Sequence, residues 1–313
     1  MNMKIRYAAR LKVIILALSL LLLVAIWVSL PSLTKNKNTA QIEVKSPVHF
    51  SSYPYFSYLP NIVLITIDTL RADHLGSYGY PRSTTPELDH LARQSVQFTR
   101  IISQAPWTLP SIISTFTGFT PLVHDVLQET SKVPDSLETL PELLQKNNYF
   151  TSGVINHLYL SRKYNFQHGF DFFDDSLLGH ENAVSAPAVA DMTIQWLQNN
   201  EEKPFFLFTH FFDPHSNYVP PRIYKKMFFG PQEATTRGNP QDCPREKIPE
   251  LLDLYDGEVR HTDKQVGRII FFLKQHNQWR DLMLICNADH GEEFGDDGST
   301  GHLFLRHEIL NVP

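Results

Sequence analysis

Cysteine is scarce in this chain, with only two residues among 313, Cys243 and Cys286. This number excludes the disulfide framework that supports small secreted domains, and the spacing excludes a CxxC zinc motif. Cys286 ends an apolar run and is expected in the core, whereas Cys243 lies in a loop-like stretch with a proline on either side. The chain is therefore expected to fold around a hydrophobic core rather than around covalent bridges.

An excess of positive charge is also absent, because the formal net charge is -5 and the sequence pI is about 6.3. Nucleic-acid-binding proteins usually carry a basic surface, so no nucleic acid partner is expected. Internal repeats are lacking too. With 42% hydrophobic residues, the chain can bury one large core, or a large domain with an appendage.

Residues 13–30 lack charge and are apolar apart from Ser19 and Ser29. At about 1.5 Å per helical residue, this run is long enough to span a bilayer. The preceding segment 1–12 is positively charged at Lys4, Arg6, Arg10 and Lys12, which favours a cytoplasmic N-terminus. A cleaved signal peptide is the alternative, although the run exceeds the usual ~7 to 15 apolar residues. We predict a single-pass transmembrane helix, with the rest of the chain on the outer, periplasmic or extracellular side.

Residues 31–60, rich in Ser, Pro, Lys and Asn, are predicted to be a linker, and residues 61–313 a single domain. In this domain, apolar runs of strand length alternate with amphipathic helical patterns. The expected strands are Ile62–Ile67, Phe150–Ile155, Phe205–Thr209 and Leu282–Cys286, and the expected helices are 86–96, 136–147, 187–199 and 248–275. Nearly continuous apolar strands predict an α/β fold, with a mostly parallel central sheet flanked by helices.

Polar residues stand where these buried strands should end. Asp68 follows the first strand, His210 follows the third, and Asp289 with His290 follows the last. Ligands of parallel α/β sheets bind beyond the carboxyl ends of the strands, so these side chains are expected to meet. A carboxylate after a strand can also be a helix cap, and for Asp68 or Asp289 alone that role stays open. Together, Asp68, Asp289 and His290 predict a site for one divalent metal ion.

Thr108 lies two residues before Pro110, which suits the first turn of a helix. A hydroxyl at a helix N-terminus and beside a metal can act as a nucleophile, and the helix dipole favours a bound oxyanion. This chemistry suits attack on a phosphate or sulfate ester. Thr108 could also be a helix cap, and Ser111 competes with it as the nucleophile.

Histidines form a further group of candidates. His210 and His215 lie close together in the sequence with Asp213 between them, and His302 follows near the C-terminus. A lone histidine after a strand often has a structural role, but two within one turn suggest contacts with a substrate or its leaving group.

Several stretches, in order, resemble the sulfatase branch of the alkaline phosphatase superfamily over about residues 61 to 313. They are Asn61–Gly79, Thr108–Ser111, His210–His215, Tyr255–Val259, Ala288–Glu293 and Gly301-His302. The resemblance implies metal ligation by Asp68, Asp289 and His290. It also implies that Thr108 is the nucleophile and lies at the metal, and that His210 and His302 are catalytic, with His210 expected to protonate the leaving oxygen. We further predict that Arg71, in the first matched stretch, and His215 contact the substrate.

The chain departs from the sulfatase pattern at the nucleophile. Sulfatases use a Cys or Ser in a C/S-x-P-x-R motif, converted to formylglycine, whereas Thr108 cannot yield that aldehyde and Ile112 replaces the Arg. Threonine nucleophiles are typical of relatives that hydrolyse or transfer phosphate, including membrane-anchored phosphoethanolamine and phosphoglycerol transferases. Thr69 also replaces a second Asp after the first strand, which implies a smaller metal shell for calcium, manganese or zinc.

In relatives the chain continues into another strand and a small C-terminal subdomain, so the end at Pro313 implies that this subdomain is missing. We predict a metal-dependent sulfatase-like hydrolase or phosphotransferase, with phosphate esters favoured and a small-molecule, lipid or glycan substrate. One alternative is a sulfuric ester hydrolase, a sulfatase that uses an unmodified hydroxyl. Another is a catalytically inactive, membrane-tethered remnant or binding protein.

Overall fold

The computed structural model describes residues 59–178, 185–200, 204–231, 238–240, 243–276, 279–296, 300–302 and 304–313. The predicted transmembrane helix at 13–30 and nearly all of the predicted linker lie outside these residues. Within the described part of the chain, no helix combines the length and apolar character needed to cross a membrane.

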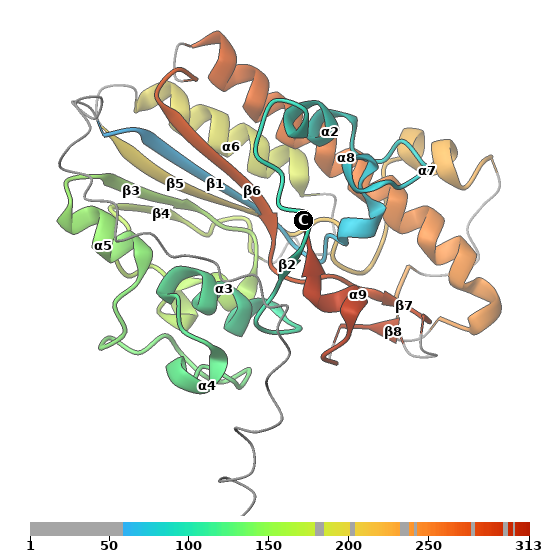
Figure 1. The fold of residues 1–313 in the computed structure, drawn as a ribbon, viewed down its shortest axis with the longest axis horizontal. Helices are drawn as coiled ribbons and strands as arrows, with labels where there is room; N and C mark the ends of the chain where they lie inside the picture. The colour runs from blue at the N-terminus through green and yellow to red at the C-terminus, as the bar shows by residue number, and fades with distance from the viewer. Residues whose placement is uncertain are drawn as a thin grey trace, which may run out of the picture. The chain divides into compact units, whose positions relative to one another are not determined.

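A five-stranded parallel sheet forms the centre of the domain, in the order β4-β3-β5-β1-β6 (Figure 1). Its strands are β1 (Asn61–Ile67), β3 (Phe150–Val154), β4 (Phe172–Asp174), β5 (Phe205–Phe211) and β6 (Leu282–Ala288). The predicted α/β fold with a parallel sheet is therefore confirmed. Both β5 and β6 run two residues further than expected. His210 therefore lies within β5, one residue before its end, rather than just after the strand.

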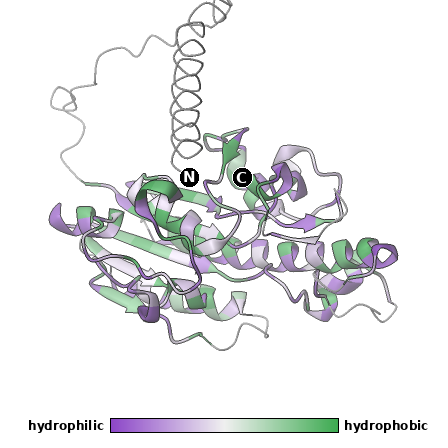
Figure 2. Ribbon diagram, turned by 90° about the horizontal axis from the view of Figure 1, so that it is seen from below, coloured by the Kyte–Doolittle hydropathy of each residue, from purple (hydrophilic) through white to green (hydrophobic). Residues whose placement is uncertain are grey.

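Helices cover both faces of this sheet (Figure 1). Successive strand residues point to opposite faces, and β1 divides its apolar side chains accordingly. Val63 and Ile65 join one buried cluster with α6 (Ala186–Asn199) and α8 (Ile248–Gln275), whereas Leu64 joins another with α3 (Thr108–Thr117). Figure 2 shows the central strands coloured mostly as hydrophobic, as expected for a sheet buried on both sides.

The remaining helices are short: α2 (Pro86–Ala92), α4 (Pro121–His124), α5 (Leu140–Lys146), α7 (Arg222–Phe228), α9 (His307–Leu310) and the 3₁₀ turns η3 (Ala72–His74), η4 (Gly76–Tyr78), η5 (Leu158–Leu160), η6 (Arg162–Tyr164) and η7 (Arg245–Lys247). Two small antiparallel pairs join β2 (Ile101–Ile102) to β9 (Asn311–Val312) and β7 (Glu293–Phe294) to β8 (Thr300–Gly301).

The start of α5 differs from the predicted start at residue 136. Thr139 is the N-cap residue, and its backbone N–H donates to the Glu142 carboxylate at 2.8 Å in a capping box. Because the capping box fixes where the helix can begin, the four residues before Leu140 stay outside it.

Candidate functional site

The carboxyl ends of β1 and β6 bring the two predicted carboxylates together. Parallel pairing places Ile67 opposite Ala288, so Asp68 and Asp289 leave the sheet side by side. Both are buried, and one ligand atom from each of Asp68, Asp289 and His290 lies within 4.8 Å of the others. Strand register thus assembles the predicted triad.

These three side chains have the unpaired acceptor atoms that a cation requires. Among the described residues, both carboxylate oxygens of Asp68 and Oδ2 of Asp289 are buried without a hydrogen-bond partner. His290 Nδ1 lies 2.9 Å from the carbonyl oxygen of Gly291, so Nδ1 carries the proton and Nε2 keeps its lone pair. That Nε2 lies 3.5 Å from Asp68 Oδ1 and 3.6 Å from Asp289 Oδ2. Two carboxylates and an imidazole lone pair fit a divalent metal.

The electrostatics of the triad also fit a bound cation. Burial and the neighbouring charges of Asp289 and Glu292 raise the pKa of Asp68, and burial raises the pKa of Asp289 to about 7. Burial lowers the pKa of His290 well below its usual value, which keeps the ring neutral. A divalent cation favours deprotonated carboxylates and neutral imidazole, and would therefore relieve the cost of burying these groups.

Thr108 points at this triad from the first position of α3. Trp107 occupies the N-cap position, so Thr108 is not the helix cap that the sequence left open. The Thr108 hydroxyl oxygen lies 3.3 Å from His290 Nε2 and 3.5 Å from His157 Nε2. The predicted nucleophile therefore lies beside the predicted metal ligands.

Ser111, the competing nucleophile, is engaged with the backbone. Its hydroxyl donates to the carbonyl oxygen of Asp289 at 2.6 Å, and the Ser103 hydroxyl lies 2.5 Å from the same oxygen. These contacts hold the backbone of Asp289 in place. Thr108 is consequently the better placed of the two hydroxyls for attack.

His157 also belongs to this cluster, although the motifs considered in the sequence do not include it. It follows β3, and its Nδ1 accepts a hydrogen bond from the backbone N–H of Tyr159 at 3.1 Å. The proton of the neutral ring is therefore on Nε2, which lies 3.6 Å from Asp68 Oδ2. Its place just beyond a strand end is the same signal that points to Asp68, and could have identified it.

The other predicted histidines converge on the same place. Ring centroids are separated by 5.6 Å between His157 and His210, 5.0 Å between His215 and His302, and 4.6 Å between His290 and His302. Burial lowers the pKa of His210 to about 3 and that of His215 to about 4. These two rings are therefore neutral near pH 7.

His302 differs from its neighbours because it has a carboxylate partner. Its Nδ1 lies 3.0 Å from Glu292 Oε1, and Glu292 Oε2 accepts a hydrogen bond from the Tyr218 hydroxyl at 2.8 Å. Burial alone would lower the pKa of His302, but Glu292 outweighs it and the pKa is raised. The His302 side chain is also 15% exposed, whereas that of His210 is fully buried.

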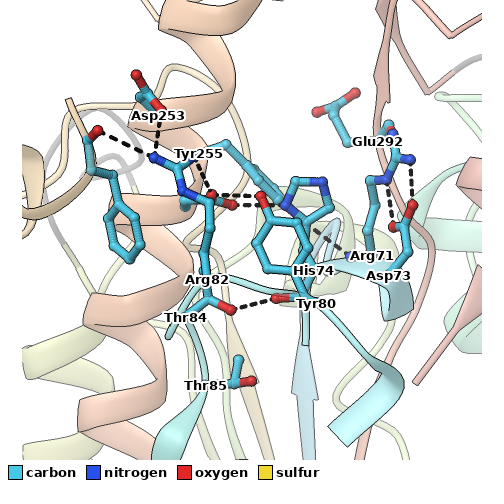
Figure 3. Close-up of polar contacts among 12 residues, drawn as sticks. Arg71, Asp73, His74, Tyr80, Arg82, Thr84, Thr85, Asp253, Tyr255 and Glu292 are labelled. Carbon is cyan, nitrogen blue, oxygen red and sulfur yellow. Dashed lines mark hydrogen bonds and ion pairs between the residues drawn. The ribbon is translucent and has the colours of Figure 1, made fainter. Parts of the chain in front are cut away.

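Arg71 and Asp213 face partners of their own. The Arg71 guanidinium donates to Asp73 at 2.9 and 2.7 Å (Figure 3). It also donates to Asp296 at 2.9 Å and to the carbonyl oxygen of Glu292 at 3.0 Å. Asp213 Oδ2 accepts from backbone N–H groups at the start of α6. Substrate contact by Arg71 stays a prediction, and the Asp213 carboxylate is engaged with the start of α6.

Comparison with known proteins identifies the family that the chain is similar to. A family model described as Sulfatase matches residues 60–308. An arylsulfatase from Clostridium perfringens is 24% identical, over 76% of this chain and 64% of that protein. The phosphatidylethanolamine transferase Mcr-2 from Escherichia coli is 25% identical, over 77% of this chain and 44% of that protein. This chain therefore spans only part of the length of these relatives.

The fold is likewise shared with solved structures. The phosphonate monoester hydrolase of Agrobacterium radiobacter has a TM-score of 0.68 at 22% identity, covering 81% of this chain and 67% of that one. The fold, the triad at the strand ends and the family match over most of the chain agree. The chain belongs to the Sulfatase family, within the alkaline phosphatase superfamily.

Proposed function

We propose that this protein is a metal-dependent hydrolase or transferase that acts on phosphate esters through Thr108. One observation carries the proposal: the Thr108 hydroxyl lies 3.3 Å from His290 Nε2, beside two buried carboxylates with unpaired oxygens. Asp68, Asp289 and His290 would hold the ion, with Thr108 beside it. A divalent metal bound there would lower the pKa of the hydroxyl and polarise the ester.

The hydroxyl proton of Thr108 would pass to water, and the resulting oxyanion would attack phosphorus to form a phospho-threonine while the bond to the leaving oxygen breaks. The N-terminus of α3 favours the negative charge of the bound phosphate. The Nε2–H of His157 is available to donate to the attacking or phosphate oxygens, since its Nδ1 is an acceptor. Water or an alcohol acceptor would then release the phosphate.

The leaving oxygen needs a proton, and the sequence suggested His210 as its source. We assign this step to His302 instead, because Glu292 holds its Nδ1 and its side chain is partly exposed. A leaving group that departs towards solvent would meet His302 before the fully buried His210.

Phosphate is favoured over sulfate for two reasons. Thr108 cannot become formylglycine, and Ile112, at the position of the sulfatase Arg, is fully buried in the apolar cluster of α3. This position therefore offers no cation for a hydrated aldehyde. We also propose that residues 13–30 anchor the protein in a membrane, with the catalytic domain on the outer side and a small-molecule, lipid or glycan ester as substrate.

The test compares wild-type protein with Thr108→Ala and the conservative Thr108→Ser on aryl phosphate and aryl sulfate esters. We expect aryl phosphate to be preferred, and kcat to fall by about 1,000-fold or more in Thr108→Ala with metal content unchanged. Intact mass should show a phosphorylated wild-type protein and no adduct on Thr108→Ala.

Three results would contradict the proposal. Undiminished turnover in Thr108→Ala would remove Thr108 from the mechanism. Preference for aryl sulfate would support the sulfatase alternative. Stoichiometric metal without turnover of either ester would support a binding protein.

A further inference from the structure

Tyr255 belongs to a matched stretch, Tyr255–Val259, to which the proposed function assigns no role. This residue lies in α8 and is fully buried. Its hydroxyl accepts from the backbone N–H of Arg71 at 2.9 Å (Figure 3) and donates to the carbonyl oxygen of Thr69 at 2.8 Å. One phenol hydroxyl thus spans the turn that directly follows Asp68.

The backbone of this turn is strained at Thr69. Its φ angle is 53°, in the left-handed region, which strains the backbone of a β-branched residue. Thr69 is fully buried, and its hydroxyl has no hydrogen-bond partner among the described residues. Its own side chain therefore does not explain the conformation, which has to be held through the backbone.

The helix that carries Tyr255 is itself fixed against the segment after the turn. Asp256 Oδ1 lies 2.7 Å from His74 Nδ1, and Asp256 Oδ2 accepts from the Tyr80 hydroxyl and from Arg82, each at 2.7 Å (Figure 3). The Asp256 side chain is fully buried. Tyr255 consequently acts from a rigid support.

On the other side of the turn, the backbone N–H of Asp68 donates to the carbonyl oxygen of Phe211 in β5 at 3.0 Å. The sheet thus holds Asp68 from one side and Tyr255 holds the following residues from the other. The direction of the Asp68 side chain depends on both restraints, because the peptide between Asp68 and Thr69 joins them.

We propose that Tyr255 is a positioning residue for the metal-binding carboxylate of Asp68. Its hydroxyl holds the strained turn so that both oxygens of Asp68 face the cluster of imidazoles. The proposal rests on the proposed function in that Asp68 is a metal ligand. In Tyr255→Phe, two buried backbone groups lose their partner and Thr69 is free to relax towards negative φ, which turns Asp68 away.

The experiment measures the affinity of the full-length protein for Zn²⁺ by competition with a chromophoric chelator. We expect Tyr255→Phe to bind Zn²⁺ about 10-fold to 100-fold more weakly than wild type. Tyr149→Phe, which removes the hydroxyl of another buried tyrosine, is the matched control and should bind like wild type. Adding Thr69→Gly to Tyr255→Phe should restore much of the affinity, because glycine adopts positive φ without strain.

The outcomes separate the two proposals. Wild-type protein that binds no Zn²⁺ would overturn the metal site itself. Zinc binding by wild type with an equal affinity in Tyr255→Phe would overturn the role of Tyr255 alone. Thr69→Gly should restore the zinc affinity of Tyr255→Phe, or its folding if that variant fails to fold. If it restores neither, Tyr255 does not act by holding Thr69.

Discussion

At the scale of single residues, two histidines of the site differ in which nitrogen carries the proton. His290 Nδ1 faces the carbonyl oxygen of Gly291, whereas His157 Nδ1 faces the backbone N–H of Tyr159. His290 therefore offers a lone pair to a cation, and His157 offers an N–H to an oxygen. The sequence could suggest the first imidazole, but the tautomers depend on local backbone groups that only the fold positions.

This difference predicts that substituting the two histidines affects metal binding and turnover differently. We expect His290→Ala to lose the metal, and His157→Ala to keep it while kcat on an aryl phosphate falls by about 100-fold or more. Elemental analysis and steady-state kinetics on the same preparations check both. Loss of metal from His157→Ala would show that His157 is a ligand.

The proton donor can be identified through the leaving group. An aryl phosphate with an acidic phenol needs little protonation, whereas an alkyl phosphate depends on it, so loss of the acid slows the alkyl ester more. We expect this selective loss in His302→Gln and a similar loss on both esters in His210→Gln. The reverse pattern would return the role to His210, as the sequence suggested.

His261, which is buried in α8, should contribute to the stability of the fold at acid pH. His261 is 4% exposed, and its Nε2 lies 3.3 Å from the amide nitrogen of Gln265. Its ring centroid lies 5.2 Å from that of Tyr224, and burial lowers its pKa to about 4. Because the folded-state pKa is below the unfolded value, the stabilisation is complete above about pH 6.5 and is lost as pH falls towards 4.

Urea unfolding of wild type and His261→Gln at pH 7 and pH 5 tests this sign. Wild type should lose about 1–2 kcal/mol more unfolding free energy than the variant over this interval. Equal losses would mean that His261 does not titrate in this range.

At the scale of elements, long periodic segments were predictable and short ones were not. The helix expected at 248–275 is α8 (Ile248–Gln275), whereas β4 (Phe172–Asp174) was not expected. Three residues give no periodic signal, and β4 exists because it pairs with β3. The left-handed turn at Thr69 was equally hidden, because propensity argues against a β-branched residue there.

Asp213 lies between His210 and His215 in sequence, but its carboxylate caps the start of another element, α6. Its Oδ2 accepts from the backbone N–H of Ser185 at 3.0 Å and of Ala186 at 2.5 Å, at the start of α6. We expect Asp213→Ala to lower the free energy of unfolding by about 2 kcal/mol, and Asp213→Asn to cost less because the amide oxygen still accepts. Urea denaturation measures both, and an unchanged Asp213→Ala protein would contradict the capping role.

At the scale of the whole molecule, the triad joins distant parts of the chain. Thr66 and Asn287, which hydrogen-bond next to it, are 221 residues apart in sequence. Sequence patterns could place each carboxylate at a strand end, but the pairing of β1 with β6 is what brings them into contact.

Because the triad exists only in the folded state, a bound metal should stabilise the whole domain. Free metal at about 100 times its Kd adds roughly 2.7 kcal/mol to the free energy of unfolding. We expect the melting temperature to rise when Mn²⁺ or Zn²⁺ replaces EDTA, and this rise to vanish in Asp289→Asn. A similar rise in the variant would place the ion elsewhere.

The strand order also determines when the triad can assemble while the chain is being synthesised. β1 is made first among the strands of the sheet, yet it is flanked by β5, whose first residue comes 144 residues after Asn61, and by β6, which comes later still. Asp68 therefore cannot meet Asp289 and His290 until β6 has been synthesised. A nascent chain that has not yet reached β6 consequently has no assembled triad with which to bind a metal ion.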